Sequence, residues 1–248
     1  MVNYIFIVKL KYKGLKGPRV ITSNILGLFL KKVEFTMRIK NIIHNYNNFK
    51  LDIEDISIEE NEIIGLVGEN GSGKTTFMDI LSQMIVANDS FEVEEYRQNE
   101  ILYIPSDVVP YEFLKVKEFC DIVINYSSSN RTRDEVMGDL GLTDKSDTKI
   151  AQLSQGMKKK LTLINLFLDK YSLVILDEPF NSVDLKYSYQ IKEIILKLRE
   201  SSTVLISSHI IDSLVDICDE FIYLEDGTVK KTFDNSGNKE ELEAELFD

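Results

Sequence analysis

The chain has 248 residues, of which 44% are hydrophobic, and this is enough for one large domain or two small ones with a real core. Its formal net charge of −12 excludes nucleic-acid binding by bulk electrostatics, so no nucleic-acid partner is expected. No apolar run in the sequence reaches the length of a membrane-spanning helix, so any membrane role requires a partner.

The two cysteines of the chain also bear on its class. Cys120 and Cys218 lie far apart, and each is inside an apolar helical pattern. We interpret them as reduced core residues of a cytosolic protein rather than as a disulfide framework.

Residues 1–36 differ in charge from the rest of the chain. They carry seven lysines and arginines against Glu34 alone, and Gly14, Gly17 and Pro18 separate two short apolar patches. Two interpretations stay open. The segment is either an arm that lies on anionic lipid or on a membrane subunit, or an unstructured extension that precedes the natural start of the domain at Met37.

The first part of the domain has the alternating pattern of strands. Residues 35–43 and 51–58 are predicted to be strands, the second half-exposed, with a polar turn over residues 44–48 between them. Near this turn, Tyr46 or Phe49 stacks on a purine ring or is an ordinary loop aromatic, and the spacing alone does not decide. Residues 60–62 form the next turn.

A phosphate-binding loop follows a short buried strand over residues 63–67. The pattern G-x-x-x-x-G-K-[ST] is met between that strand and an amphipathic helix over residues 76–81, which makes a plain glycine-rich turn the weaker interpretation. Glycines let successive N–H groups point at phosphate oxygens, and the helix N-terminus adds positive potential. The sequence therefore predicts nucleoside triphosphate binding by Gly68, Glu69, Asn70, Gly71, Ser72, Gly73, Lys74, Thr75 and Thr76.

A helical insert is predicted after the next strands. Residues 91–93 and 101–104 are predicted strands, and Pro105 ends the second. From residue 115 to about residue 148 the apolar period becomes helical, with two faces separated by the polar linker 127–133. This pattern predicts a small helical insert within an α/β protein.

Adjacent carboxylates follow the next buried strand. Ser154 is predicted to cap a helix, and residues 173–176 form a continuous apolar run that ends in Asp177 and Glu178. Such a pair is either a solvated strand end or part of a site, because open α/β sheets bind ligands at the carboxyl ends of their strands. With a phosphate loop upstream, we favour magnesium coordination by Asp177 and water activation by Glu178.

The last third of the chain continues the α/β alternation. We expect a helix over residues 185–198, a strand over residues 203–207 that leads to His209, and a hairpin over residues 221–233. A lone histidine is more often structural, but this one also ends a strand on the phosphate side. The acidic tail from Asp234 is predicted to be weakly helical and solvated.

Taken together, residues 37–233 resemble the nucleotide-binding subunit of an ABC transporter. Leu153-Ser154-Gln155-Gly156-Met157 is similar to the family's L-S-G-G-Q signature, and its Gly-Met form before lysines resembles subunits of exporters with separate permeases. Residues 181–184 resemble the D-loop, His209 the switch histidine, and Tyr46 the aromatic residue that stacks on adenine.

The resemblance implies a fold and an activity. The fold would be an α/β P-loop NTPase with a mostly parallel core sheet, an N-terminal antiparallel β part, and a helical insert over about residues 107–152. The activity would be ATP hydrolysis with Mg²⁺ in a head-to-tail dimer, homo- or heteromeric, that drives a separate transmembrane permease from the cytoplasmic face of the membrane. Lys74, Glu178 and His209 would be catalytic, Thr75, Asp177 and Ser106 would surround the metal, and Ser154 and Gly156 would contact the nucleotide across the dimer.

The sequence departs from the family pattern in places. Ser106 stands where the family has a glutamine that links the magnesium site to the helical insert, which puts this coupling in doubt, although a serine can still hold a water on the ion. Gln155 and Met157 also depart from the usual signature. Two alternatives therefore stay open: an ABC-type ATPase without a membrane partner, and a regulatory subunit with a degenerate site. The transported substrate and the direction of transport are not determined.

Overall fold

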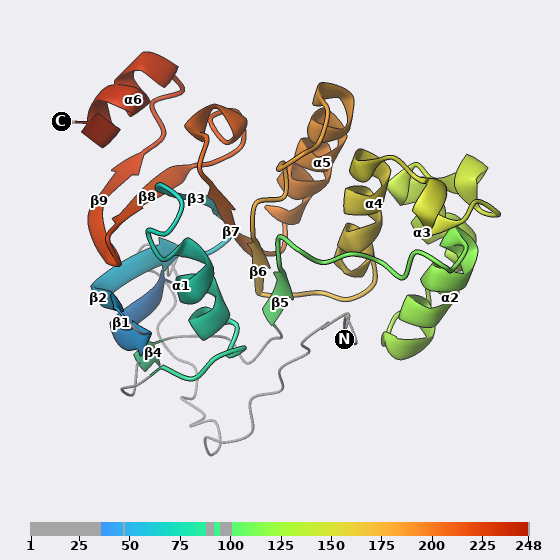
Figure 1. The fold of residues 1–248 in the computed structure, drawn as a ribbon, viewed down its shortest axis with the longest axis horizontal. Helices are drawn as coiled ribbons and strands as arrows, with labels where there is room; N and C mark the ends of the chain where they lie inside the picture. Colours follow the sequence, from blue (N-terminus) through green and yellow to red (C-terminus); the bar gives the residue numbers. More distant parts are fainter. Residues whose placement is uncertain (1–35, 47, 88–91, 95–100, 248) are drawn as a thin grey trace, which may run out of the picture.

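The computed structural model describes residues 36–46, 48–87, 92–94 and 101–247. The basic segment 1–35, for which an arm and an unstructured extension were both left open, and Phe91, the predicted start of a strand, lie outside these residues. The predicted fold class is confirmed, because a mostly parallel sheet, an antiparallel β part and flanking helices make up the described chain (Figure 1). No helix in the described ranges has both the length and the apolarity needed to cross a bilayer.

The main sheet has six strands in the order β5-β6-β7-β3-β8-β9, and β9 alone among them runs antiparallel to its neighbour. Its central strands β6, β7 and β3 are buried along their whole length, which is why their sequences are mainly continuous apolar runs rather than alternating ones. The strands are β3 (Ile63–Val67), β5 (Ile101–Ile104), β6 (Leu173–Leu176), β7 (Thr203–Ser208), β8 (Glu220–Glu225) and β9 (Thr228–Asp234).

A second, antiparallel sheet has the order β2-β1-β4, formed by β1 (Thr36–Tyr46), β2 (Phe49–Glu59) and β4 (Glu92–Glu94). The turn predicted over residues 44–48 was placed too early. Strand β1 continues to Tyr46, which pairs with Phe49, so the polar residues 44 and 45 belong to the ladder. Polar composition indicated a turn, but cross-strand hydrogen bonds extend the strand.

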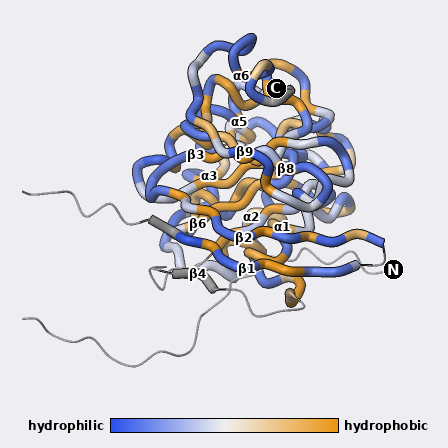
Figure 2. Tube along the Cα trace, turned by 90° about the vertical axis from the view of Figure 1, so that its left-hand side faces the viewer, coloured by the Kyte–Doolittle hydropathy of each residue, from blue (hydrophilic) through white to orange (hydrophobic). Residues whose placement is uncertain are grey.

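Helices α1 (Lys74–Leu81) and α5 (Leu185–Leu198) cover opposite faces of the main sheet. Phe77 and Met78 of α1 pack with residues of both sheets in one buried cluster, whereas Ile191 and Ile195 of α5 pack with Val204 in another. Figure 2 shows the resulting arrangement, with apolar segments through the middle of the molecule and hydrophilic segments towards its periphery.

The helices that follow β5 form a region of their own beside the main sheet (Figure 1). Phe119, Met137 and Leu161 belong to a buried cluster separate from the two sheet clusters. The helix predicted after Ser154 is short, since α4 ends at Thr162 and the chain continues in 3-10 geometry. The elements are α2 (Val116–Tyr126), α3 (Arg133–Leu140), α4 (Gln155–Thr162) and the 3-10 helices η1 (Thr143–Lys145), η2 (Ile150–Gln152) and η3 (Leu163–Phe167).

The acidic tail forms the predicted helix, α6 (Lys239–Phe247), and most of its described residues are exposed as predicted, but one of them is buried. Leu242 is only 1% exposed and belongs to the cluster beneath the 3-10 helix η4 (Ile211–Ser213). The Asn235 side-chain amide donates to the carbonyls of Val215 and Cys218, both at 2.7 Å. One apolar residue and one amide therefore dock a segment whose overall composition is acidic. Cys218 and Cys120 are both buried and unpaired, as predicted.

Candidate functional site

The candidate site lies at one edge of the main sheet, where four parallel strands end. Strand β3 leads into the phosphate loop, β5 into Ser106, β6 into Asp177 and β7 into His209. Because these strands are parallel, their carboxyl ends meet at the same edge. A cavity of about 560 Å³ opens there, lined by Tyr46, Phe49, Asn70, Gly71, Gly73, Lys74, Thr75, Thr76, Ser106, Asp177, Glu178, Asn181 and His209.

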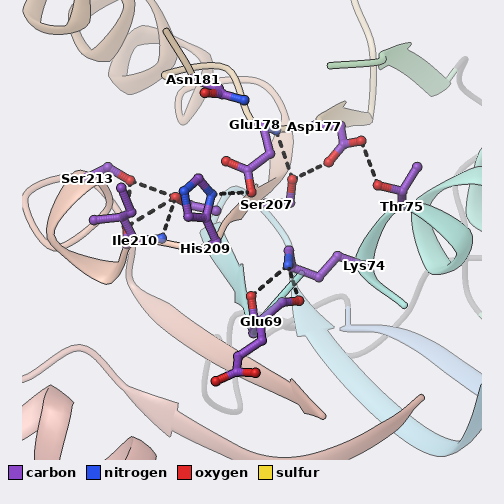
Figure 3. Close-up of polar contacts among 12 residues, drawn as sticks. Glu69, Lys74, Thr75, Asp177, Glu178, Asn181, Ser207, His209, Ile210 and Ser213 are labelled. Atoms are coloured by element: carbon purple, nitrogen blue, oxygen red, sulfur yellow. Dashed lines mark hydrogen bonds and ion pairs between the residues drawn. The ribbon is translucent and has the colours of Figure 1, made fainter. Parts of the chain in front are cut away.

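Gly73 is the last residue of the phosphate loop before α1, where the backbone turns tightly. Its φ is 106°, and a Cβ at this position would lie 2.7 Å from the Phe49 ring, so conformation and space both require glycine. Helix α1 begins at the next residue, which directs its N-terminus into the cavity. The Lys74 ammonium donates to the carbonyls of Gly68 and Glu69 at 2.6 and 2.9 Å (Figure 3). Burial lowers the pKa of Lys74, and the carboxylates of Glu178 and Asp177 oppose this shift.

Both oxygens of the buried Asp177 carboxylate accept hydrogen bonds from hydroxyl groups. Thr75 Oγ1 donates to Oδ2 at 2.9 Å, and Ser207 Oγ donates to Oδ1 (Figure 3). Ser207 is fully buried on β7, between the strand that carries the phosphate loop and the strand that carries Asp177. The sequence did not lead us to predict Ser207 as a site residue. The feature that could have indicated it is a serine near the end of a continuous apolar strand.

Glu178 lies beside Asp177 in an unusual backbone conformation. Its φ is +46°, and its N–H donates to Ser207 Oγ at 2.9 Å, so one hydroxyl holds both members of the carboxylate pair. One carboxylate oxygen of Glu178 is 3.0 Å from Nδ1 of His209. A carboxylate and an imidazole in contact beside a phosphate loop can share a proton and orient a water molecule.

The two aromatic residues left open by the sequence both line the cavity but differ in their surroundings. Phe49 packs against Gly73 of the phosphate loop, as its 2.7 Å approach to the position of a Cβ shows. Tyr46 is 67% exposed, so the face of its ring is accessible from solvent. This difference favours Tyr46 as the residue available for stacking on a base.

Some predicted site residues do not line this cavity. Ser154 caps α4 and accepts from the Met157 N–H at 3.3 Å, away from the cavity of its own chain. A Cβ on Gly156 would lie 2.5 Å from Tyr187, so the glycine lets α4 approach α5.

Ser72 is buried, and its hydroxyl lacks a hydrogen-bond partner within the described part of the chain. Gly68 and Glu69 shape the loop through their carbonyls. Asn181 lines the cavity although it was not among the predicted binding residues.

Ser106 lines the cavity, and its backbone has a partner that the sequence did not indicate. Lys159 of α4 donates from Nζ to the Ser106 carbonyl at 2.9 Å. Burial lowers the pKa of Lys159, and Asp177, Asp107 and Glu178 oppose this shift. A positive charge from α4 therefore lies within electrostatic reach of the carboxylate pair.

A phosphate loop at a helix N-terminus, with a carboxylate pair at the end of a neighbouring strand, defines a P-loop nucleoside triphosphatase. The family model described as "ABC transporter" matches residues 51–181, more than half of the chain. The chain belongs to this family as an ATP-binding subunit, and its domain is an ATPase that binds ATP and ADP.

Similarity to individual proteins agrees with this assignment. The chain is 29% identical over 210 residues to the ABC transporter ATP-binding protein YtrB of Bacillus subtilis, covering 76% of this chain and 69% of that protein. It is 30% identical to the tungstate uptake system ATP-binding protein TupC of Peptoclostridium acidaminophilum, covering 72% and 89% respectively. A solved dimeric, post-hydrolysis ATP-binding cassette bound to ADP and Pi, MJ0796, superposes with a TM-score of 0.67 at 17% identity, covering 82% of this chain and 100% of that one.

Proposed function

We propose that this chain hydrolyses ATP in a head-to-tail dimer and thereby drives a substrate through a separate membrane permease. The observation that carries the proposal is the convergence of Lys74, Thr75, Asp177, Glu178 and His209 on one cavity from three different segments. Phosphoryl transfer needs charge neutralisation and an oriented water more than covalent chemistry, and these groups are of the types that supply both.

Each group has a distinct role in this proposal. Lys74 and the amides of the phosphate loop neutralise the β- and γ-phosphates. Glu178 accepts a proton from the attacking water, and His209, in contact with it at 3.0 Å, holds the carboxylate and reaches the γ-phosphate. Tyr46 stacks on the adenine.

The oxygen atoms near the phosphate loop fit Mg²⁺. Thr75 Oγ1 and Asp177 Oδ2 lie 2.9 Å apart at the cavity wall, and hydroxyl and carboxylate oxygens are the donors this ion prefers. Thr75 and Asp177 would hold the ion, with Ser106 at its edge, and the ion would add positive charge against the phosphates. Ser207 would keep Asp177 oriented for this task, because it holds the other carboxylate oxygen.

The dimer is supported by the place of Ser154. This residue is exposed at the start of α4 and does not line its own cavity, so it would reach a phosphate only in a second subunit. Its position at a helix N-terminus suits an anion. The structural neighbour MJ0796 is described as a dimer with ADP and Pi, which is consistent with a two-subunit site.

The proposed partner is a permease with membrane spans of its own, which would bring this chain to the cytoplasmic face of the membrane. Export is the proposed direction because Gly156-Met157 before a lysine run resembles exporter subunits. The relative TupC is named as part of an uptake system, so a transport assay has to be able to detect both directions.

The first experiment measures the mass of Glu178→Gln protein by analytical ultracentrifugation, with and without ATP and Mg²⁺. A shift from monomer to dimer only with ATP is expected, because the amide keeps the shape of the site but cannot accept the proton. Adding Ser154→Ala to this variant should weaken the dimer without weakening nucleotide binding to the monomer. A Glu178→Gln protein that binds ATP and stays monomeric would contradict the sandwich dimer.

A second experiment tests the permease. The tagged chain is crosslinked in cells, the membrane fraction is isolated, and the crosslinked partner is identified by mass spectrometry. A partner with several apolar spans is expected. Recovery of the chain only with partners that lack such spans would favour the alternative of an ABC-type ATPase that works without a permease. Inside-out and right-side-out vesicles of the complex then give the direction.

A further inference from the structure

Three consecutive lysines of α4 contact the chain at three points, two in the segment of residues 106–115 and one on α5. Lys158 pairs with Glu112, Lys159 donates to the Ser106 carbonyl at 2.9 Å, and Lys160 donates to the Gln190 side chain at 2.9 Å. Successive residues of a helix point about 100° apart, so a lysine run can connect one helix to several neighbours. The run is therefore more than a solvated helix face.

Lys159 is the lysine of this run that points toward the nucleotide cavity. Its side chain is half-buried, and it forms no ion pair with the described carboxylates, so its ammonium is held chiefly by the Ser106 carbonyl. The charges of Asp177, Asp107 and Glu178 act on this ammonium, and all three are negative. Attraction by these groups favours the position of the ammonium at the cavity edge.

The segment of residues 106–115 joins the cavity edge to α2, and its two ends are held differently. At the far end, backbone bonds from Ile150 to Leu114 and from Ala151 to Glu112, at 2.9 and 3.0 Å, fix it to the helical region. At the cavity end, Lys159 supplies the connection to α4 through a side chain. Backbone hydrogen bonds thus fix one end to the helical region, and the Lys159 side chain connects the other end to α4.

We propose that Lys159 is a positioning residue that ties α4 to the Ser106 end of the nucleotide cavity, so that the signature helix and the cavity edge move as one unit. Helix α4 begins next to Ser154, which the proposed dimer presents to the phosphate of the other subunit. The effect of Lys159 on hydrolysis rests on that proposed function, whereas the tie itself is a property of the isolated chain.

The acceptor of the Lys159 hydrogen bond is a main-chain carbonyl, that of Ser106, and this gives a first discriminating variant. Ser106→Ala retains the acceptor of Lys159 while removing the hydroxyl expected near the metal. Lys159→Met removes the donor and keeps a flexible apolar stem of similar length. The tie is therefore sensitive to the residue at position 159 and insensitive to the side chain at position 106.

The chain contains no tryptophan, so one introduced tryptophan reports on this segment alone. Val109 is 48% exposed and lies three residues after Ser106, which makes Val109→Trp a suitable reporter. Fluorescence anisotropy decay of the nucleotide-free protein is measured in this background for Lys159→Met, Lys159→Arg, Ser106→Ala and Lys158→Met. Faster local motion is expected in Lys159→Met only, since Lys159→Arg keeps a donor and Lys158 contacts Glu112 at the end that backbone hydrogen bonds already fix.

Steady-state hydrolysis and binding of a fluorescent ATP analogue are measured on the same Lys159 and Lys158 variants without the reporter. Lys159→Met should lower kcat by about tenfold, because small displacements of catalytic groups are costly, and should change the nucleotide Kd less than twofold. Lys159→Arg should restore kcat, and Lys158→Met should leave kcat and Kd unchanged. Circular dichroism melting identifies any variant that has lost its fold.

The outcomes separate the tie from the dimer. Unchanged anisotropy in Lys159→Met, or an equal change in Lys158→Met, overturns the tie whether or not the protein dimerises. Increased motion with an unchanged kcat overturns the positioning role. If the Glu178→Gln protein fails to dimerise with ATP, the proposed function fails, while the anisotropy result still decides whether Lys159 holds the segment.

Discussion

The main sheet has one edge at the carboxyl ends of its parallel strands and another at their amino ends. These two edges carry carboxylates in opposite circumstances. At the edge where β6 and β7 end, Asp177 is bonded by two hydroxyls and Glu178 contacts His209. At the other edge, Glu220 begins β8 opposite Asp234 of β9, with Glu62 and Glu59 near it. Burial and these three carboxylates raise the pKa of Glu220 to about 7.

The difference between the edges lies in their partners rather than in their residue types. The cavity edge supplies hydroxyl donors, the ammonium groups of Lys74 and Lys159, and the N-terminus of α1, all of which stabilise negative charge. At the other edge, Arg199 pairs with Asp219, and the carboxylate of Asp219 also accepts the Ile63 N–H at 2.9 Å. Glu220 faces its acidic neighbours. The cavity edge is therefore suited to ligand binding and catalysis. At the other edge, called the acidic edge below, burial of Glu220 near other carboxylates lowers the stability of the fold.

The largest effect that would test the cavity edge is expected from Glu178→Gln. The amide cannot accept the proton of the attacking water, so hydrolysis should fall at least ~100-fold while ATP still binds. Phosphate release and equilibrium binding of a fluorescent ATP analogue measure the two quantities separately. Near-normal turnover would remove Glu178 from its proposed role.

Lys74→Ala should weaken ATP binding by about 30-fold, because it removes a charged donor at the phosphate loop. Isothermal titration with ATP and Mg²⁺ gives the affinity. The matched control is Lys192→Ala, which removes a lysine that pairs with Asp216 away from the cavity and should leave affinity unchanged. Equal affinity in Lys74→Ala and the wild type would mean that the loop is not the binding site.

Ser207→Ala should lower kcat by about tenfold and leave the nucleotide Kd nearly unchanged. The substitution removes the hydroxyl that holds Asp177 and accepts from the Glu178 N–H, so both carboxylates lose orientation. Ser207→Thr keeps the hydroxyl and should retain most activity. A similar loss in both variants would point to packing on β7 instead of to the hydrogen bonds.

Glu220→Gln sharpens the comparison from the acidic edge and has the smallest expected effect. The pKa of Glu220 is raised from 4.5 to about 7 in the folded chain, so the folded state binds its proton more tightly than the unfolded state. Its contribution to stability is therefore favourable below about pH 4.5 and is lost as the pH rises towards about 7. Because the side chain is only half-buried, we expect a gain of about 1 kcal/mol for Glu220→Gln at pH 8 and little change at pH 4.5.

Urea unfolding of Glu220→Gln and the wild type at several pH values measures this difference. Glu240→Gln, an exposed change of the same type on α6, serves as the control. A stability difference that does not depend on pH would contradict the ionisation of Glu220 as its cause.

The sequence predicted most elements of the fold and most of the residues that line the cavity. Continuous apolar runs predicted the buried strands, because a strand covered on both faces has no polar side. Helix α5 has the predicted bounds, 185–198, and Ser154 caps α4 as predicted. Strong local signals explain these successes: a capping side chain and a clear change of apolar period.

Local composition failed where distant contacts compete with it. The polar end of β1 indicated a turn, yet pairing with β2 makes it a strand. The tail from Asp234 indicated a solvated segment, yet Leu242 and Asn235 dock it onto the region after β7. In both cases a few long-range contacts outweigh the average character of the segment.

The sequence by itself determined that this chain carries a phosphate loop and a carboxylate pair at strand ends, because each is a contiguous motif with a local physical reason. The tertiary structure alone decided which groups from distant segments meet them. Ser207 reaches Asp177 because β7 lies between β6 and β3, and Lys159 reaches Ser106 because α4 packs beside the end of β5. Strand order and helix packing are set by the whole core, and no motif in the sequence encodes them.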